Sequence, residues 1–286
     1  MATPAELIQA FVSRTGPLAF SNVFGASAAT HADRRQTFAK SLRERVEDPG
    51  KISQASTMLC GPAAFMFCVA KKRPDAYVSY AIELAEKGAA KIGKFQVSPS
   101  TECRNTSLAS STIDPVDWVT LAGLRDSANH MLHMDSTDGK ARAMTPPGHI
   151  VWWFYFSELF KDVIDNTNLV FNKKLSDMVQ AEQRRAAGYF VCLFVGSTGL
   201  GTAIGNDKIP DHWIVLTNEL RVGGDTTAWL SSLGRSIDTD KTLNKKQIAF
   251  EAYTWGESRA HVPTSRARPL TVDNFLRYFW GYVCAK

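Results

Sequence analysis

The pattern of apolar and polar positions divides the chain into a helical first part and a strand-rich second part. In residues 33–46, for example, Phe38, Leu42 and Val46 fall on one face, which is the period of an amphipathic helix. The predicted helices cover residues 3–13, 33–46, 58–70, 75–87 and 114–129, a segment that begins at Thr145-Pro146, and residues 174–187. Residues 95–113 are predicted to form a strand and a polar loop.

Local signals at the ends of these segments support the helices. The run Thr3-Pro4-Ala5-Glu6 is a capping box with proline at the first helical position. Asp75 is expected to cap the helix over 75–87, and Gly88 supplies a left-handed terminator.

After residue 188 the pattern changes to that of strands. Residues 189–195 are a continuous apolar run, typical of a strand buried on both faces. A glycine-rich loop over 196–210 follows. Further strands are predicted from His212 to about Leu220 and over 248–255, a turn over 222–225, and a last helix over 271–279 that leads into Gly281. Helices followed by a mainly antiparallel sheet predict an α+β fold in a single domain, 1–286, with a helical part at about 1–188 and a sheet part at about 189–286.

Composition narrows the class of protein. The chain is 44% hydrophobic and 21% charged, an ordinary globular balance. It contains no apolar window of about 18 residues, so no membrane insertion is predicted. The N-terminus lacks the basic and apolar regions of a secretory signal. We expect a soluble product that is cytoplasmic as made, and any export would need a dedicated, signal-peptide-independent machine.

Cysteine usage and charge argue against several kinds of site. Five cysteines are an odd number and form no CxxC pair, which disfavours a disulfide framework and a cysteine zinc site. The net charge of +5 is modest and its basic residues are scattered, so nucleic acid is not an expected partner. We expect no metal and no cofactor.

Cys60 begins a predicted helix and is the strongest candidate nucleophile. A helix N-terminus favours the thiolate, because its unpaired amides and dipole stabilise negative charge. The following Gly61 lets a substrate approach the backbone, and Pro62 sacrifices no helical hydrogen bond. Gln54, six residues upstream, lies on the loop that enters the helix, where its amide could donate to an oxyanion beside the Cys60 sulfur.

His212 opens a buried strand and is the candidate base. A rigid strand end is a suitable mount for an imidazole that must face a thiolate on a separate helix. The run Tyr253-Thr254-Trp255-Gly256 ends what we expect to be a neighbouring strand.

These segments resemble the papain-like cysteine peptidase superfamily. The Gln54-to-Cys60 spacing is a family spacing, and Cys60-Gly61-Pro62-Ala63-Ala64 is most similar to bacterial double-glycine leader peptidases and papain-like effector peptidases. The Trp213-Ile-Val-Leu run after His212 resembles the family's histidine strand. Thr254-Trp255-Gly256 resembles the Asn-Ser-Trp-Gly of papain relatives, which implies that Trp255 shields the far side of the histidine.

The residue that orients His212 is left open by the resemblance. The family's asparagine position falls on Tyr253, which cannot do the same work. Leader peptidases place an aspartate about sixteen residues after the histidine, a region in which Asp225 lies in a turn. Glu251 is another candidate, and a Cys–His dyad without an orienter is a third possibility.

Other motifs have simpler interpretations. His149 and His261 are weaker competitors for the base, and Cys68, Cys192 and Cys284 are expected to be buried hydrophobes. His130 and His133 are expected to lie at a solvated helix end rather than in a metal site. The glycines of 196–201 are expected to form a flexible loop rather than a phosphate loop, and the aromatic residues 152–156 to belong to the core rather than to a substrate groove.

The sequence therefore predicts a cysteine peptidase that cleaves a protein substrate through a thioester. The same chemistry also serves deamidases, transglutaminases and acyltransferases, and a different class is an inactive peptidase-like binding module. The resemblance to effector peptidases suggests a bacterial toxin with a cognate immunity protein, and the alternative is an intracellular processing peptidase.

Overall fold

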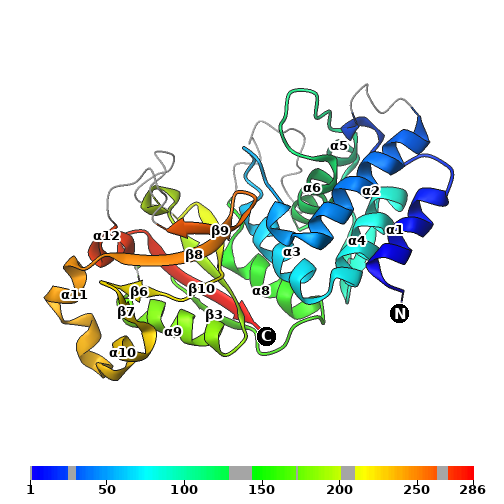
Figure 1. The fold of residues 1–286 in the computed structure, drawn as a ribbon. Helices are drawn as coiled ribbons and strands as arrows, with labels where there is room; N and C mark the ends of the chain where they lie inside the picture. The colour runs from blue at the N-terminus through cyan, green and yellow to red at the C-terminus, as the bar shows by residue number, and fades with distance from the viewer. Residues whose placement is uncertain (1, 25–29, 129–143, 172, 201–209, 263–269) are drawn as a thin grey trace. The chain divides into compact units, whose positions relative to one another are not determined.

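The computed structural model describes residues 2–24, 30–128, 144–171, 173–200, 210–262 and 270–286. These form two compact units, Met1–Leu159 and Phe160–Lys286 (Figure 1). The first is mainly helical and the second is built on an antiparallel sheet, so the predicted α+β class is confirmed.

The main helices of the first unit follow the predicted pattern closely. They are α1 (Pro4–Ser13), α2 (His31–Glu47), α3 (Cys60–Lys72), α4 (Pro74–Lys87) and α8 (Pro147–Phe156). The capping box forms as predicted, because the Glu6 carboxylate accepts from the Thr3 amide at 2.8 Å and the Thr3 hydroxyl accepts from the Glu6 amide. One cap was assigned wrongly: α4 begins after Arg73, and Asp75 instead forms an ion pair with Arg73 in the first turn.

The predicted helix over 114–129 is divided into three segments. A short helix, α6 (Pro115–Asp117), is followed by the π-helical turn η3 (Trp118–Ala122) and then by α7 (Gly123–Ser127). A π-helical turn is often found at functional positions, because it re-aims the side chains that follow it. The region predicted as a strand and a loop contains a hairpin of β1 (Ala90–Ile92) and β2 (Phe95–Val97), followed by α5 (Thr101–Asn105).

Helix α3 is the buried centre of the first unit. Every residue from Cys60 to Ala70 is buried. The Phe65 ring packs against Trp153 and Phe154 of α8, with ring centroids 5.8 and 5.4 Å apart. A helix that is apolar on all sides must be enclosed by others, so its position is fixed by packing rather than by an amphipathic stripe.

The sheet of the second unit has the strand order β3-β10-β4-β5-β8-β6-β7, with β9 also paired to β8, and all pairs are antiparallel. The strands are β3 (Ile164–Thr167), β4 (Phe190–Val195), β5 (His212–Leu216), β6 (Arg221–Val222), β7 (Asp225–Thr226), β8 (Ile248–Thr254), β9 (Glu257–Val262) and β10 (Phe279–Ala285). The interior strands β5 and β10 are buried throughout, and β4 is buried from Val191 onward, as the continuous apolar runs require.

The structure changes three details of the sequence-based sheet. Strand β5 ends at Leu216 rather than near Leu220. The last helix, α12, is confined to Val272–Leu276, and the residues after it form β10. Strand β3 was not predicted, because Asp165 and Asn166 give it a polar sequence.

The boundary between the units also differs from the expected change at 188–189. It falls between Leu159 and Phe160, because β3 pairs with β10 and helix α9 (Leu175–Ala186) packs against β4. The buried residues Leu175 and Met178 of α9 belong to the core of the sheet unit.

Gly281 provides a stability test of the sheet. Its φ is +112°, and a Cβ there would overlap the carbonyl oxygen of Asn166 on β3. Gly281→Ala is expected to lower the free energy of unfolding by about 3 kcal/mol, measured by chemical denaturation. Gly224→Ala is the matched control, since Gly224 also has a positive φ but open space around it, and about 1 kcal/mol is expected there. Equal losses in the two variants would show that the contact with β3 is not the cause.

Candidate functional site

Cys60 is the first residue of α3, as the sequence predicted. Leu59 is the N-cap, and its carbonyl accepts the first helical hydrogen bond from the Ala63 amide at 2.9 Å. The side chain of Cys60 lies at the positive end of the helix dipole, where a thiolate is favoured. Cys60 is 4% exposed. The next residue must be glycine, because a Cβ on Gly61 would overlap the Thr145 side chain that precedes α8.

The loop that carries Gln54 is fixed by a buried ion pair. Asp117 accepts two hydrogen bonds from Arg45, at 2.8 and 2.6 Å, and a third from the Ser53 amide at 3.1 Å. Ala55 has a φ of +50°, an uncommon value for a residue with a Cβ. The segment just before Cys60 is therefore held in a specific and strained conformation.

Gln54 has an unsatisfied side chain. It is 7% exposed, and its Oε1 is buried without a hydrogen-bond partner among the described residues. Its backbone carbonyl, in contrast, accepts from both the amide and the hydroxyl of Thr57. The two ends of a glutamine amide are assigned from hydrogen bonding, so one buried end of this amide has no partner among the described residues. The oxyanion role of Gln54 stays a prediction.

Arg125 lies in the neighbourhood of Cys60 and was not identified from the sequence. This residue of α7 is 2% exposed, and burial lowers the pKa of its guanidinium while the charge of Cys60 acts in the opposite direction. Its Nη1 is 3.1 Å from Nδ1 of His149, in the first turn of α8. The sequence did contain a signal, since Arg125 directly follows the apolar stretch 118–124 of a predicted helix. An arginine buried in such a position is rare unless a specific electrostatic environment stabilises its charge.

His149, one of the competitors for the base, is unsuited to that role by this contact. Arginine has donors and no acceptor, so Arg125 donates to Nδ1 and the neutral ring carries its proton on Nε2. The adjacent cation also disfavours protonation of the ring. His149 is thus a hydrogen-bond acceptor for Arg125 in the first unit.

His212 in the second unit has the surroundings of an oriented imidazole. It is the first residue of β5, and its Nε2 lies 2.7 Å from the Thr254 hydroxyl oxygen at the end of β8. Its ring stacks on Trp255, with centroids 4.6 Å apart and an interplanar angle of 11°. The shielding of His212 by Trp255, implied by the family resemblance, is present in the structure.

Two neighbouring contacts fix the entrance to β5. The amide of Asp211 donates to the carbonyl of Val195 at 3.2 Å, and its carboxylate accepts from the amide and hydroxyl of Ser197. Burial lowers the pKa of His212 to about 3, so the ring is neutral near pH 7. A neutral imidazole carries its proton on one ring nitrogen and can accept a proton at the other, and the Thr254 hydroxyl can serve as the partner of Nε2 in either tautomer.

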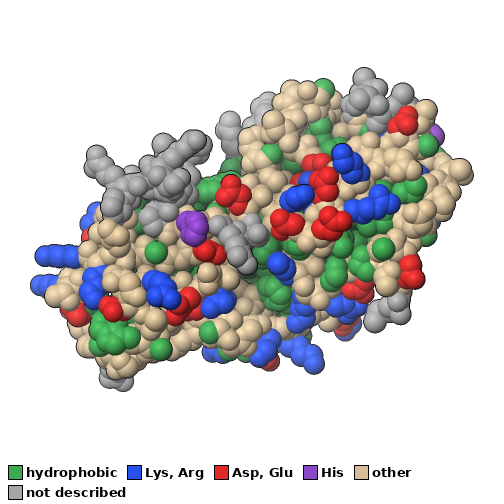
Figure 2. Space-filling model, viewed as in Figure 1, with side chains coloured by type: hydrophobic (Ala, Val, Ile, Leu, Met, Phe, Trp, Pro, Cys, Tyr) green, Lys and Arg blue, Asp and Glu red, His purple; other side chains and the backbone are tan. Residues whose placement is uncertain are grey.

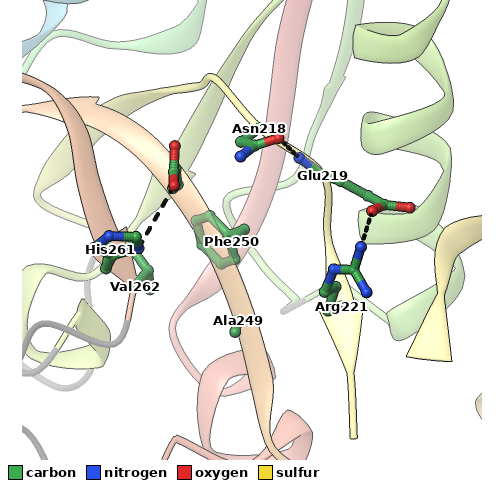
Figure 3. Close-up of a pocket in the computed structure, with 8 residues that line it drawn as sticks. Asn218, Glu219, Arg221, Ala249, Phe250, His261 and Val262 are labelled. Carbon is green, nitrogen blue, oxygen red and sulfur yellow. Dashed lines mark hydrogen bonds and ion pairs between the residues drawn. The ribbon is translucent and has the colours of Figure 1, made fainter. Parts of the chain in front are cut away.

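The His212 ring is bonded to Thr254 and not to the carboxylates considered from the sequence. Asp225 forms an ion pair with Lys246 at 2.8 Å. Glu251 lies 3.7 Å from Nδ1 of His261, the contact drawn as the dashed line to His261 in Figure 3. Neither carboxylate is bonded to His212, whose partner is a hydroxyl. The sequence signal was present in the Thr254-Trp255-Gly256 run, although the usual orienting groups are carboxylates and amides.

The lining of the pocket in Figure 3 does not include His212, Thr254 or Trp255. The pocket has a volume of about 280 Å³ on β6, β8 and β9, and its charged lining consists of the Glu251–His261 and Glu219–Arg221 pairs. His261, the other competitor for the base, has a side chain that is 79% exposed. Because both acids already have a partner, the pocket shows no unpaired charge that would define a ligand.

The other features weighed from the sequence have mixed outcomes. All five cysteines lie in the described part of the chain, are buried and form no disulfide. The aromatic segment is core only in part, because Trp153 and Phe154 are buried while Trp152 and Tyr155 are 56% and 65% exposed. His130, His133 and residues 201–209 of the glycine-rich loop lie outside the described residues. No metal-binding group of His, Cys, Asp and Glu occurs within the described ranges.

The surface charges are of both signs. On the face shown in Figure 2, Lys and Arg side chains lie beside Asp and Glu side chains in each unit. In the part of the chain that the structure describes, no helix has the length and apolar character to cross a bilayer.

The Trp255-Gly256 turn offers a test of strain beside His212. Both residues have positive φ, +47° and +84°, in the two-residue loop between β8 and β9. Such loops favour asparagine at the first position, because its short polar side chain tolerates positive φ, whereas tryptophan is strained there. Trp255→Asn is therefore expected to be about 1 kcal/mol more stable than Trp255→Ala, although both lose the stacked indole. Thermal or chemical denaturation of the two variants measures the difference, and equal stabilities would refute strain at this position.

Comparisons with known proteins find no match: no protein-family model, no curated protein and no solved structure is similar to this chain.

Proposed function

We propose that the chain is a papain-like cysteine peptidase in which Cys60 is the nucleophile and His212 is the base. The observation that carries the proposal is the setting of His212, a neutral strand-end imidazole bonded to Thr254 and stacked on Trp255. A ring held by one nitrogen and covered on one face presents its other nitrogen in a fixed direction, as a general base must. The resemblance of the Cys60 and His212 segments to the papain-like superfamily supplies the pairing of the two residues.

The proposed reaction begins with attack of the Cys60 sulfur on a peptide carbonyl carbon. As the S–C bond forms, the thiol proton passes to His212 Nδ1. His212 then gives this proton to the leaving amine when the C–N bond breaks. Water attacks the resulting thioester, with His212 as base, and releases the acid product and the thiol. Gln54 and the Cys60 amide are proposed to donate to the oxyanion.

Thr254 would act in this scheme by holding the ring through Nε2, which lies 2.7 Å from the hydroxyl oxygen. In the tautomer that the scheme requires, the Nε2–H of His212 donates to this oxygen and the proton-accepting lone pair is on Nδ1. A hydroxyl is neutral, so it orients the ring without stabilising an imidazolium as a carboxylate does. The base in this protein is accordingly proposed to remain neutral until the proton transfer itself.

The most direct test is proteomic mapping of new protein N-termini in cells that express the wild type, Cys60→Ala or His212→Gln. The proposal requires new N-termini that appear with the wild type and are absent with both variants. Labelling of Cys60 by a peptidyl epoxide, read by mass spectrometry, checks that a sulfur with 4% exposure is reached by substrate-like molecules. Identical N-termini in all three samples would exclude proteolysis.

The same experiment distinguishes the alternative chemistries. A glutamine deamidase would leave chains intact and raise a substrate mass by about one dalton, and a transglutaminase or acyltransferase would add a group. An inactive binding module would produce none of these changes and no epoxide labelling. The toxin role with an immunity protein is a further proposal, and it requires growth inhibition by the wild type that Cys60→Ala does not cause.

A further inference from the structure

The N-terminal ends of α3 and α8 lie together in the first unit. Gly61 contacts Thr145, just before α8, and further along the two helices Phe65 packs against Trp153. The positive ends of both helix dipoles are therefore near Cys60, and the buried Arg125 bonds to the first turn of α8 through His149. This end of the unit concentrates positive potential around one sulfur.

We propose that Arg125 is a positioning residue that stabilises the thiolate of Cys60, and that His149 holds its guanidinium in place. The relevance of this arrangement to catalysis rests on the proposed function. The effect of Arg125 on the thiol does not depend on that function. The electrostatic interaction between two groups is mutual: the negative charge of the Cys60 sulfur stabilises the charged guanidinium, so the guanidinium stabilises the Cys60 thiolate to the same extent.

The other charged groups around α3 have separate engagements. Asp126 accepts from the Ser100 amide at 2.6 Å and acts electrostatically on Cys103. Asp117 is bonded to Arg45 and Ser53. Lys71 and Lys72 are in the last turn of α3, at the opposite end from Cys60. Arg125, by contrast, is buried and interacts electrostatically with Cys60.

His149 determines where the guanidinium points. Its Nδ1 accepts the Nη1–H of Arg125, and its ring lies 5.9 and 5.8 Å from the rings of Trp152 and Trp153. A planar guanidinium whose Nη1 is held by a hydrogen bond has fewer orientations available, so the position of its charge is not averaged over several rotamers.

The arrangement divides two tasks that an imidazolium often combines. His212 is buried and neutral, so it can accept a proton but supplies no positive charge. Arg125 cannot accept a proton but is always charged. Lowering the thiol pKa by means of Arg125 would reduce the cost of moving the Cys60 proton to a buried, weakly basic imidazole.

The test is the pH dependence of Cys60 alkylation in the full-length protein. Iodoacetamide reacts with the thiolate, and mass spectrometry of the peptide that contains Cys60 gives its rate at each pH. The wild type is expected to show an inflection at least one pH unit below the ordinary thiol value of about 8.5. Arg125→Met should raise the inflection by about one unit or more, and slow the reaction about tenfold at pH 6.5. His149→Gln should give an intermediate value and Arg125→Lys should retain most of the shift, since it keeps the charge.

His212→Gln separates this inference from the proposed function. If Arg125 supplies the charge, the inflection is the same in His212→Gln as in the wild type. An inflection that moves in His212→Gln and stays in place in Arg125→Met would overturn the inference while supporting the dyad. An ordinary thiol inflection in the wild type would overturn it even if Arg125→Met did not fold. The two proposals can also fail separately. If the thiol inflection depends on Arg125 but the protein produces no new N-termini in cells, the inference stands and the proposed peptidase function is wrong.

Discussion

Replacing His212 by glutamine is expected to slow cleavage of a peptide that spans a mapped cleavage site by 100- to 10,000-fold, with little change in KM. This is the usual contribution of a general base to the chemical step. Glutamine has a similar length to histidine and its amide can still bond to the Thr254 hydroxyl, so the buried polar group keeps a partner. The loss would then report on proton transfer rather than on an empty cavity.

Two matched variants make this result specific to His212. His261→Gln changes an exposed histidine on β9 and is expected to retain full activity. Cys60→Ala should be as inactive as the double variant Cys60→Ala/His212→Gln, because residues that act as one unit are not additive. A His212→Gln enzyme with wild-type kcat would require another base, and a double variant with much lower residual activity than Cys60→Ala would separate the two residues.

The sequence identified the two central residues of this candidate site, but it did not identify the residues that contact them. Cys60 at the start of α3 and His212 at the start of β5 follow from local signals: a Cys-Gly-Pro helix start and an apolar strand run. Trp255 was placed by the resemblance of its Trp-Gly run, and its positive φ explains how a turn residue covers the imidazole.

Thr254 and Arg125 were missed for a physical reason. A hydroxyl or guanidinium acquires its role from what the fold places beside it, and neither residue differs in sequence from a structural one. Arg125 is brought to Cys60 through a π-helical turn and a contact with α8, which are tertiary features. The same holds for β3 and β10, whose pairing across more than a hundred residues leaves no local pattern in the polar strand β3.

The second large effect concerns the stability of the fold in acid. The pKa of His212 is about 3 in the folded protein and about 6.5 when the ring is exposed to water. The unfolded chain therefore binds a proton at His212 between these values while the folded chain does not. By linkage, this residue makes the free energy of unfolding fall as the pH decreases from about 6.5 toward 3, and it contributes nothing to the slope above pH 7.

The measurement is chemical denaturation of the wild type and His212→Gln at pH 6 and pH 4. The wild type is expected to lose about 2.5 kcal/mol more than the variant over this interval, the linkage value for one proton taken up with these two pKa values. The comparison cancels groups that both proteins share. Chief among these is Asp117, whose pKa is raised to about 6 by burial and whose protonation in the folded state acts in the opposite direction over the same range. Parallel losses in the two proteins would show that the imidazole is charged in the fold, and the neutral base on which the proton transfer from Cys60 depends would then be ruled out.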